Sequence, residues 1–354
     1  MKIKTFFLVM LLAFSAFPAI AEDADFTVDG FSYAITSTTN LTVEVVKGPD
    51  QAVVTVPSTV VFNKRTFRVT EIGGAAFSGR GLKSIDMPSI TYISDGYYYD
   101  DRVGAVGAFI GCKNLSQVNM PSATSIGAYA FKGCDALTSV TMPAATSIGD
   151  DAFSGCEALT SVTLPVATSI RQNAFSGCYA LTSVTMPAAT SIDHEAFINC
   201  KALTSVTLPV ATSISIYAFS GCQSLSDIYV GSDPAVCYYS PFDKVTYATA
   251  TLHVPAGCAS KYKAAEYWKQ FAFISEDYDP TGIKNINAEK VKVLCDNGNV
   301  NITGLKNGEK IEFYSVNGQL LGTSVANSGA VSFKTSERIV ICKIAGISIK
   351  VLVK

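Results

Sequence analysis

One spacing limits what this chain can fold into. Six cysteines recur at intervals of 22 residues: Cys112, Cys134, Cys156, Cys178, Cys200 and Cys222. The segments that follow two of them read CDALTSVTMPAATSIGDDAFSG and CEALTSVTLPVATSIRQNAFSG, so most positions of the period are fixed. A unit of this length cannot bury an apolar face alone, and neighbouring units must stack and share one core. The period therefore predicts a solenoid.

The apolar pattern assigns a direction to each side chain of the turn that starts at Cys134. Leu137, Val140 and Met142 alternate with polar residues, so they should point inward from a short strand, while Ser139 and Thr141 point outward. The other inward positions expected in this turn are Ile148, Ala152, Phe153 and Cys156. Periods of 20 to 29 residues with this leucine pattern indicate a leucine-rich-repeat solenoid of short strands plus turns or short helices. The array should cover residues 66–230, including a degenerate first copy.

The repeat also carries a family resemblance. The combination GC-x-x-L-x-x-V-x-(M/L)-P with x-S-I-x-x-x-A-F resembles the BspA-like leucine-rich repeats of bacterial surface proteins. That resemblance implies adhesion to host proteins and to other cells. It also implies an N-terminal β cap over residues 22–65 and a closing segment over residues 231–278.

The first 21 residues have the pattern of a secretory signal. Lys2 and Lys4 precede an apolar stretch, and Ala19-Ile20-Ala21 forms an A-x-A cleavage site. The later apolar run from Ile339 to Val353 is interrupted by lysines, so no membrane helix is expected there. We therefore expect an exported protein, at the cell surface or secreted, with a periplasmic location as the alternative.

Residues 279–354 differ in kind from the repeats. A polar stretch with Pro280 and Gly282 reads as a linker, and short segments of alternating apolar and polar residues follow it. Asn317-Gly318 between two such segments predicts a hairpin. The pattern indicates a small all-β sandwich. It resembles the C-terminal secretion or sorting domains of type IX-like systems, which implies a role in export or attachment.

The cysteines divide into two groups. We call the six cysteines that recur every 22 residues the ladder cysteines. Equivalent residues of stacked turns point the same way, so these cysteines should be buried reduced thiols. We prefer this interpretation to a redox role. Four cysteines lie outside the ladder, and an exported chain permits disulfides. Two disulfide bridges are possible, one between Cys237 and Cys258 and one between Cys295 and Cys342.

Composition argues against several functions. The chain has 27 basic and 29 acidic residues without a basic run, so nucleic acid is not expected as a partner. Of its two histidines, His194 and His253, neither has a nucleophile beside it in sequence, and both are expected at the surface. No motif for catalysis, a metal or a cofactor is found. We therefore expect neither an enzyme nor a bound cofactor or metal.

The outward columns of the repeats are the predicted binding face, listed here by turn: Ser139 and Thr141, Ser161 and Thr163, Ser183 and Thr185, Ser205 and Thr207. Such a neutral hydroxyl face could dock a protein or a glycan, it could match an ice or crystal lattice, or it could reflect only that Thr favours exposed strands. An insertion adds Tyr97, Tyr98 and Tyr99, which are equally suited to ligand contact and to packing on a cap.

The sequence as a whole predicts a secreted or cell-surface leucine-rich-repeat protein that mediates protein interaction or adhesion, with host matrix proteins as candidate ligands. The alternative is a glycan-binding surface or periplasmic module. An enzyme without a recognisable motif is a remote third reading.

Overall fold

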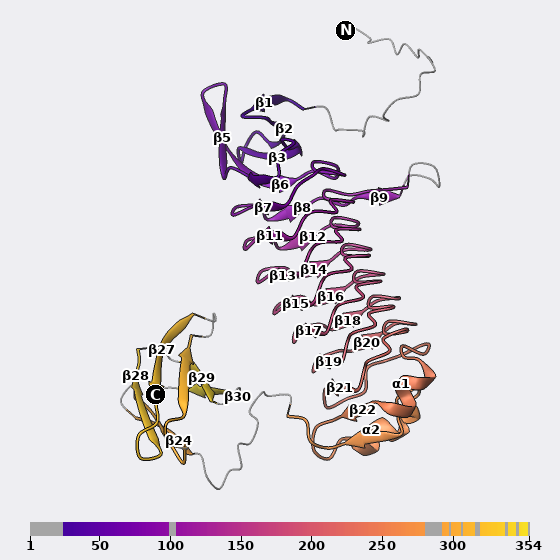
Figure 1. Ribbon diagram of the computed structural model, residues 1–354, viewed down its shortest axis with the longest axis vertical. Coiled ribbons are helices and arrows are strands. Elements are labelled where there is room, and N and C mark those ends of the chain that lie inside the picture. The colour runs from indigo at the N-terminus through magenta and orange to yellow at the C-terminus, as the bar shows by residue number, and fades with distance from the viewer. Residues whose placement is uncertain are drawn as a thin grey trace. The chain divides into compact units, whose positions relative to one another are not determined.

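The computed structural model describes residues 24–98, 104–279, 292–296, 299–305, 307–315, 319–336, 339–344 and 347–352 (Figure 1). The chain forms two compact units. The first runs to Val206 and includes Thr212–Leu225 and Val236–Asp243. The second holds Thr207–Ala211, Ser226–Ala235 and the residues from Lys244 onward. The predicted signal sequence (residues 1–21) lies outside the described residues.

The first unit begins with an antiparallel sheet made of β1 (Phe26–Val28), β2 (Phe31–Ser37) and β3 (Thr42–Lys47). Strand β3 pairs in parallel with β6 (Arg65–Ile72), which also forms a hairpin with β5 (Thr59–Phe62). Strand β6 then pairs in parallel with β8 (Tyr92–Ile93), the first of a row of two-residue strands. The N-terminal sheet thus passes without a break into the solenoid.

Each turn of the solenoid contributes two strands. The front strands of the first unit are β4 (Val53–Thr55), β7 (Ser84–Asp86), β11 (Gln117–Asn119), β13 (Ser139–Thr141), β15 (Ser161–Thr163) and β17 (Ser183–Thr185), and β19 (Ser205–Leu208) runs across the boundary between the units. The back strands are β8, β12 (Ser125–Ile126), β14 (Ser147–Ile148), β16 (Ser169–Ile170), β18 (Ser191–Ile192) and β20 (Ser213–Ile214). Equivalent residues lie opposite each other, as in the pairs Val140 with Val162 and Ile148 with Ile170. The leucine-rich-repeat solenoid predicted from the period is therefore confirmed (Figure 1).

The core of the repeats contains ladders of identical side chains. Buried phenylalanine rings stack in nearly parallel pairs, with Phe131 and Phe153 at a centroid distance of 5.1 Å. The six ladder cysteines are buried free thiols, as predicted. Each thiol donates a hydrogen bond to the carbonyl of a phenylalanine in the preceding turn, for example Cys156 to Phe131 at 3.2 Å.

The backbone conformation explains why a glycine precedes most of the ladder cysteines. Gly155 has a φ of +73°, and nothing lies closer than 3.8 Å to the position where a Cβ would stand. The backbone conformation alone, rather than space, therefore favours glycine at this position. Asn199 takes the equivalent place in a later turn with a φ of +61°, as Asn tolerates the left-handed region better than most residues.

The second unit continues with parallel strands β21 (Asp227–Val230), β22 (Thr251–His253) and β23 (Phe273–Ser275). Its helices are α1 (Lys244–Thr249), α2 (Ala259–Ala264) and the 3₁₀ turn η1 (Trp268–Gln270). Buried Trp268 donates through Nε1 to the carbonyl of Ala235 at 2.8 Å, and buried Tyr262 donates to the carbonyl of Gly231 at 2.9 Å. Large buried aromatic side chains thus hold this segment together through packing and hydrogen bonds.

The C-terminal part of the chain is all-β. One sheet contains β24 (Lys292–Asp296), β25 (Asn299–Thr303) and β28 (Ala330–Lys334), and the other contains β26 (Lys310–Tyr314), β27 (Leu320–Val325), β29 (Ile339–Ile344) and β30 (Ile347–Leu352). A small core joins them, with Phe313 and Phe333 stacked at 4.0 Å. Strands β26 and β27 pair antiparallel, whereas Asn317 and Gly318 between them lie outside the described residues.

None of the helices in the described residues is both long enough and apolar enough to span a bilayer.

Candidate functional site

The front strands present their alternate side chains to solvent in columns. In β13, β15 and β17 the serine and threonine at the two ends of each strand are exposed, whereas the valine between them is buried. The columns are in register: Ser139, Ser161 and Ser183 pair in order, as do Thr141, Thr163 and Thr185. Ser205 and Thr207 of β19 are half-buried. The predicted face therefore exists as an ordered surface, most exposed on β13, β15 and β17.

Two sets of threonine hydroxyls must be distinguished. Just before the front strands, Thr182 Oγ1 donates to the carbonyl of Thr160 at 3.0 Å, and Thr160 makes the same bond to Thr138. These hydroxyls join successive turns, which is a structural reason for their repetition. Across the residues that the structure describes, the hydroxyls of Thr163 and Thr185 on the face make no hydrogen bond. The face hydroxyls are thus available to a partner.

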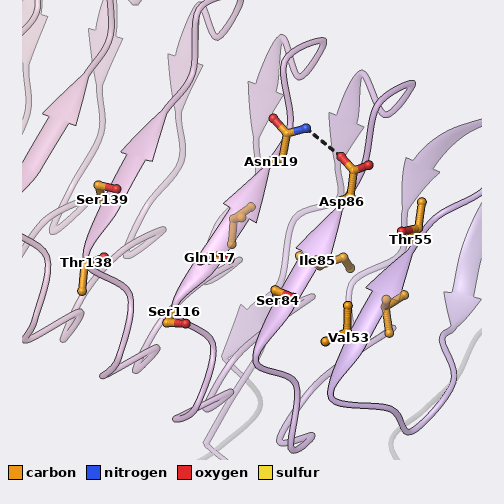
Figure 2. Close-up of a pocket in the computed structure, with 12 residues that line it drawn as sticks. Val53, Thr55, Ser84, Ile85, Asp86, Ser116, Gln117, Asn119, Thr138 and Ser139 are labelled. Carbon is orange, nitrogen blue, oxygen red and sulfur yellow. Dashed lines mark hydrogen bonds between the residues drawn. The ribbon is translucent and has the colours of Figure 1, made fainter.

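A groove of about 400 Å³ lies at the N-terminal end of this face (Figure 2). Strands β4, β7, β11 and β13 line it with Val53, Val54, Thr55, Ser84, Ile85, Asp86, Ser116, Gln117, Val118, Asn119, Thr138 and Ser139. Asn119 Nδ2 donates to Asp86 Oδ1 at 2.7 Å, which holds the carboxylate in place. Asp86 is the one ionisable residue in this lining, so the groove is polar and nearly neutral.

The outward columns of the sequence also contain Ser84, Gln117, Asp86 and Asn119, but Ser139 was the one residue of the lining that was predicted to bind a ligand. The available signal was a departure from the repeat. Asp86 and Asn119 stand where the regular turns have threonine, and Gln117 stands where they have serine. The groove is therefore formed where the repeats diverge.

The insertion forms a separate feature. Strand β9 (Tyr97–Tyr98) pairs antiparallel with β10 (Ala105–Val106). The exposed fractions of Tyr97 and Tyr98 are 40% and 55%, and neither residue lines the groove. Tyr99 lies outside the described residues. Ligand contact by these tyrosines remains a prediction.

The expectation of two surface histidines is wrong for His253. Its side chain is only 11% exposed, with Nδ1 2.7 Å from Asp277 and Nε2 3.0 Å from Asp227. Its ring stacks on Tyr229 at 4.4 Å. Hydrogen bonds from Ser226 and His253 lower the pKa of Asp227. His253 is half-buried because the carboxylates of Asp227 and Asp277 lie within hydrogen-bond distance of its two ring nitrogens. His194 is 39% exposed, as expected.

The six ladder cysteines are buried, which disfavours the redox alternative for them. Burial raises the pKa of five thiols, those of Cys112, Cys134, Cys156, Cys178 and Cys200, and that of Cys156 rises to about 12. Cys258 is a buried free thiol, so a bridge from Cys237 to Cys258 is not formed. The side chain of Cys295 lies outside the described residues, and a bridge to Cys342 therefore remains a prediction. Within the described ranges, no three His, Cys, Asp or Glu side chains gather as a metal site requires.

Comparison with protein families identifies two regions. Residues 105–226 match the BspA type leucine rich repeat region in six copies. Residues 280–353 match a domain of unknown function, DUF6383. Within residues 105–226 the repeats therefore match the BspA type. The C-terminal match names no secretion domain.

Solved structures of bacterial repeat proteins are also similar to this chain. A leucine-rich repeat protein from Bacteroides ovatus is 21% identical over 70% of this chain and 81% of its own, with a TM-score of 0.32. A leucine rich repeat protein from T. pallidum is 20% identical over 68% and 96%, with a TM-score of 0.42. A leucine rich cell surface protein from Faecalibacterium prausnitzii is 20% identical over 72% and 95%, with a TM-score of 0.35. The search of curated proteins found no match.

Proposed function

We propose that this chain, whose repeats are of the BspA type, is an exported, non-enzymatic adhesin that docks a protein partner on its front strands. The observation that carries the proposal is the ordered array of exposed face hydroxyls without hydrogen-bond partners in the described chain. Repeat solenoids commonly use one extended face for binding. Extracellular matrix proteins of a host are the candidate partners, in keeping with the resemblance of the repeats.

The chemistry of the face defines how the partner is held. Serine and threonine hydroxyls both donate and accept hydrogen bonds, and the columns on β13, β15 and β17 carry no charge. Electrostatic steering should therefore contribute little to association. Hydrogen bonds and close contact should supply the affinity.

A glycan is the second candidate ligand. The observation that favours it is the polar, nearly neutral groove at the N-terminal end of the face. Its lining contains no aromatic residue, so ring stacking would not contribute there.

We further propose that the C-terminal β domain serves export or attachment. Its support is the resemblance noted in the sequence, together with its separate small core. A role of this kind would place the solenoid at the cell surface or outside the cell.

The proposed function is tested by a binding screen. The mature chain is measured against immobilised host matrix proteins at low and physiological salt. We expect binding to at least one of them, with an affinity that changes little between the two salt concentrations. Absence of binding to every matrix protein, or binding that disappears with salt, would contradict the proposal.

A further inference from the structure

The front sheet of the first unit is interrupted between β11 and β13. Hydrogen-bonded pairing joins β4, β7 and β11 in one group and begins again at β13. At the next junction Thr160 N–H donates to the carbonyl of Thr138 at 2.9 Å, and Met142 N–H donates to that of Thr163 at 3.3 Å. In the described chain, the equivalent bonds from Thr138 to Ser116 and from Met120 to Thr141 are not made. We call this opening the seam.

The seam is confined to the front strands. In the same turns, Ser125 pairs with Ser147 on the back strands, and Thr146 N–H donates to the carbonyl of Thr124 at 2.8 Å. The ladder bond from Cys134 to the carbonyl of Phe109 is also kept, at 3.2 Å. A general loosening of the turn therefore does not explain the opening.

The seam coincides with the groove. Ser116, Thr138 and Ser139 line the groove on the two sides of the seam, and Gln117 and Asn119 lie beside them (Figure 2). Val118 is half-buried there, whereas Val140 in the next turn is buried. Ser116 and Thr138, whose carbonyl and N–H lack the bond made at the next junction, thus both line the groove. Backbone groups of this kind bind another partner when they lose their own.

We propose that the seam and the groove bind a neutral saccharide. A sugar hydroxyl donates and accepts at once, so one hydroxyl can bridge the N–H of Thr138 and the carbonyl of Ser116. Asp86 Oδ1 accepts from Asn119, which leaves Oδ2 to accept from a second hydroxyl. This proposal rests on the front strands being the binding face, and it assigns the glycan candidate to one location.

The lining favours a saccharide over an extended peptide. Peptide recognition by strands requires pockets for alternate side chains. The polar groups that line the groove are hydroxyls, amides and one carboxylate. Val53 is the one exposed apolar side chain of the lining. The single carboxylate of Asp86 also disfavours an acidic sugar, because like charges repel.

The experiment has two parts on the mature chain. A printed array of neutral, sialylated and sulfated oligosaccharides first selects the neutral oligosaccharide that binds most tightly. Amide hydrogen exchange of residues 116–142 is then followed with and without that oligosaccharide. We expect the amides of Thr138 and Met120 to exchange faster than those of Thr160 and Met142 in the free protein, and the amide of Thr138 to exchange more slowly when the sugar binds.

Matched variants locate the site. Gln117→Ala/Asn119→Ala should weaken binding of the neutral oligosaccharide by about tenfold, because it removes the Gln117 amide that lines the groove and the Asn119 amide that holds Asp86 in place. Gln172→Ala/Gln223→Ala removes two exposed side-chain amides outside the front strands and should leave binding of the neutral oligosaccharide unchanged. Equal losses in both variants would overturn the assignment to the seam.

Other outcomes separate this proposal from the protein-binding one. If no neutral oligosaccharide binds, or if the amides of Thr138 and Met120 are as protected as Thr160 in the free protein, the saccharide site is overturned. Protection of the seam by a peptide and not by any sugar would also overturn it. In each case the binding of matrix proteins remains measurable, so a failure here leaves the proposed adhesin function intact.

Discussion

Cys156 shows how a single residue can serve the fold in two ways. Its side chain is fully buried, and its thiol donates to the carbonyl of Phe131 at 3.2 Å. Burial raises the pKa of the thiol to about 12, so the neutral form persists near neutral pH. The burial could be predicted from the 22-residue period. The hydrogen bond could not, because it joins residues of different turns whose distance depends on how the turns stack.

Replacement and labelling of Cys156 test this assignment. Cys156→Ser should reduce the free energy of unfolding by about 1 to 3 kcal/mol, because it buries a more polar hydroxyl at an apolar site. Urea unfolding measures the effect, with Cys156→Ala as the control for size. The native thiols should resist a thiol reagent and react after denaturation. Rapid labelling of the native chain would contradict their burial.

Alkaline pH should destabilise the first unit through these thiols. The pKa of Cys156 rises from 9.0 to about 12 on folding, so the unfolded chain loses this proton first. The stabilisation is complete below the unfolded pKa and is lost as pH rises toward the folded value. Unfolding in the presence of a reductant should therefore require less urea at pH of about 10 than at about 7.5. Cys156→Ala/Cys178→Ala should show a smaller decrease, and an equal decrease would assign the effect to other groups.

At the scale of the elements, the strands were predictable and the groove was not. Alternation of polar and apolar residues determines which side of β13 or β15 is buried, so the columns follow from the sequence. The seam between β11 and β13 arises because hydrogen bonds between these two turns are not made, and such bonds cannot be read from the pattern of one turn. Its only local signal is the replacement of Ser and Thr by Gln117, Asn119 and Asp86. The partial burial of His253 was missed for a similar reason, because Asp227 and Asp277 come from segments distant from it in sequence.

The two classes of threonine provide a test at this scale. Thr182→Val removes the hydrogen bond to the carbonyl of Thr160 and should cost about 0.5 to 1.5 kcal/mol of stability. Thr185→Val, three residues later on the exposed face, should cost almost nothing. Thermal or urea unfolding of the two variants compares them directly. Similar costs would show that the face hydroxyls also serve the fold.

At the scale of the whole molecule, the boundary before the C-terminal β domain can be drawn from contacts. Asp277 contacts His253, and Tyr278 packs against Tyr229 at 5.3 Å. A chain that ends at Asp279 retains these contacts and should fold normally. If the last domain serves export or attachment, the shortened chain should fail to reach the cell surface. Cell fractionation measures this, and normal surface display would remove the sorting role.

The central claim is that the front strands form the binding face, and a pair of charge-matched variants tests it most directly. Thr163→Lys/Thr185→Lys places two like charges about 4.8 Å apart on the face, while Val162 and Val184 beneath remain buried. Val166→Lys/Gln172→Lys adds the same charge at exposed positions outside the front strands. We predict that the first variant folds but loses binding to the matrix protein found in the screen, and that the second binds as the unaltered chain does. Unchanged binding by the first variant would contradict the account.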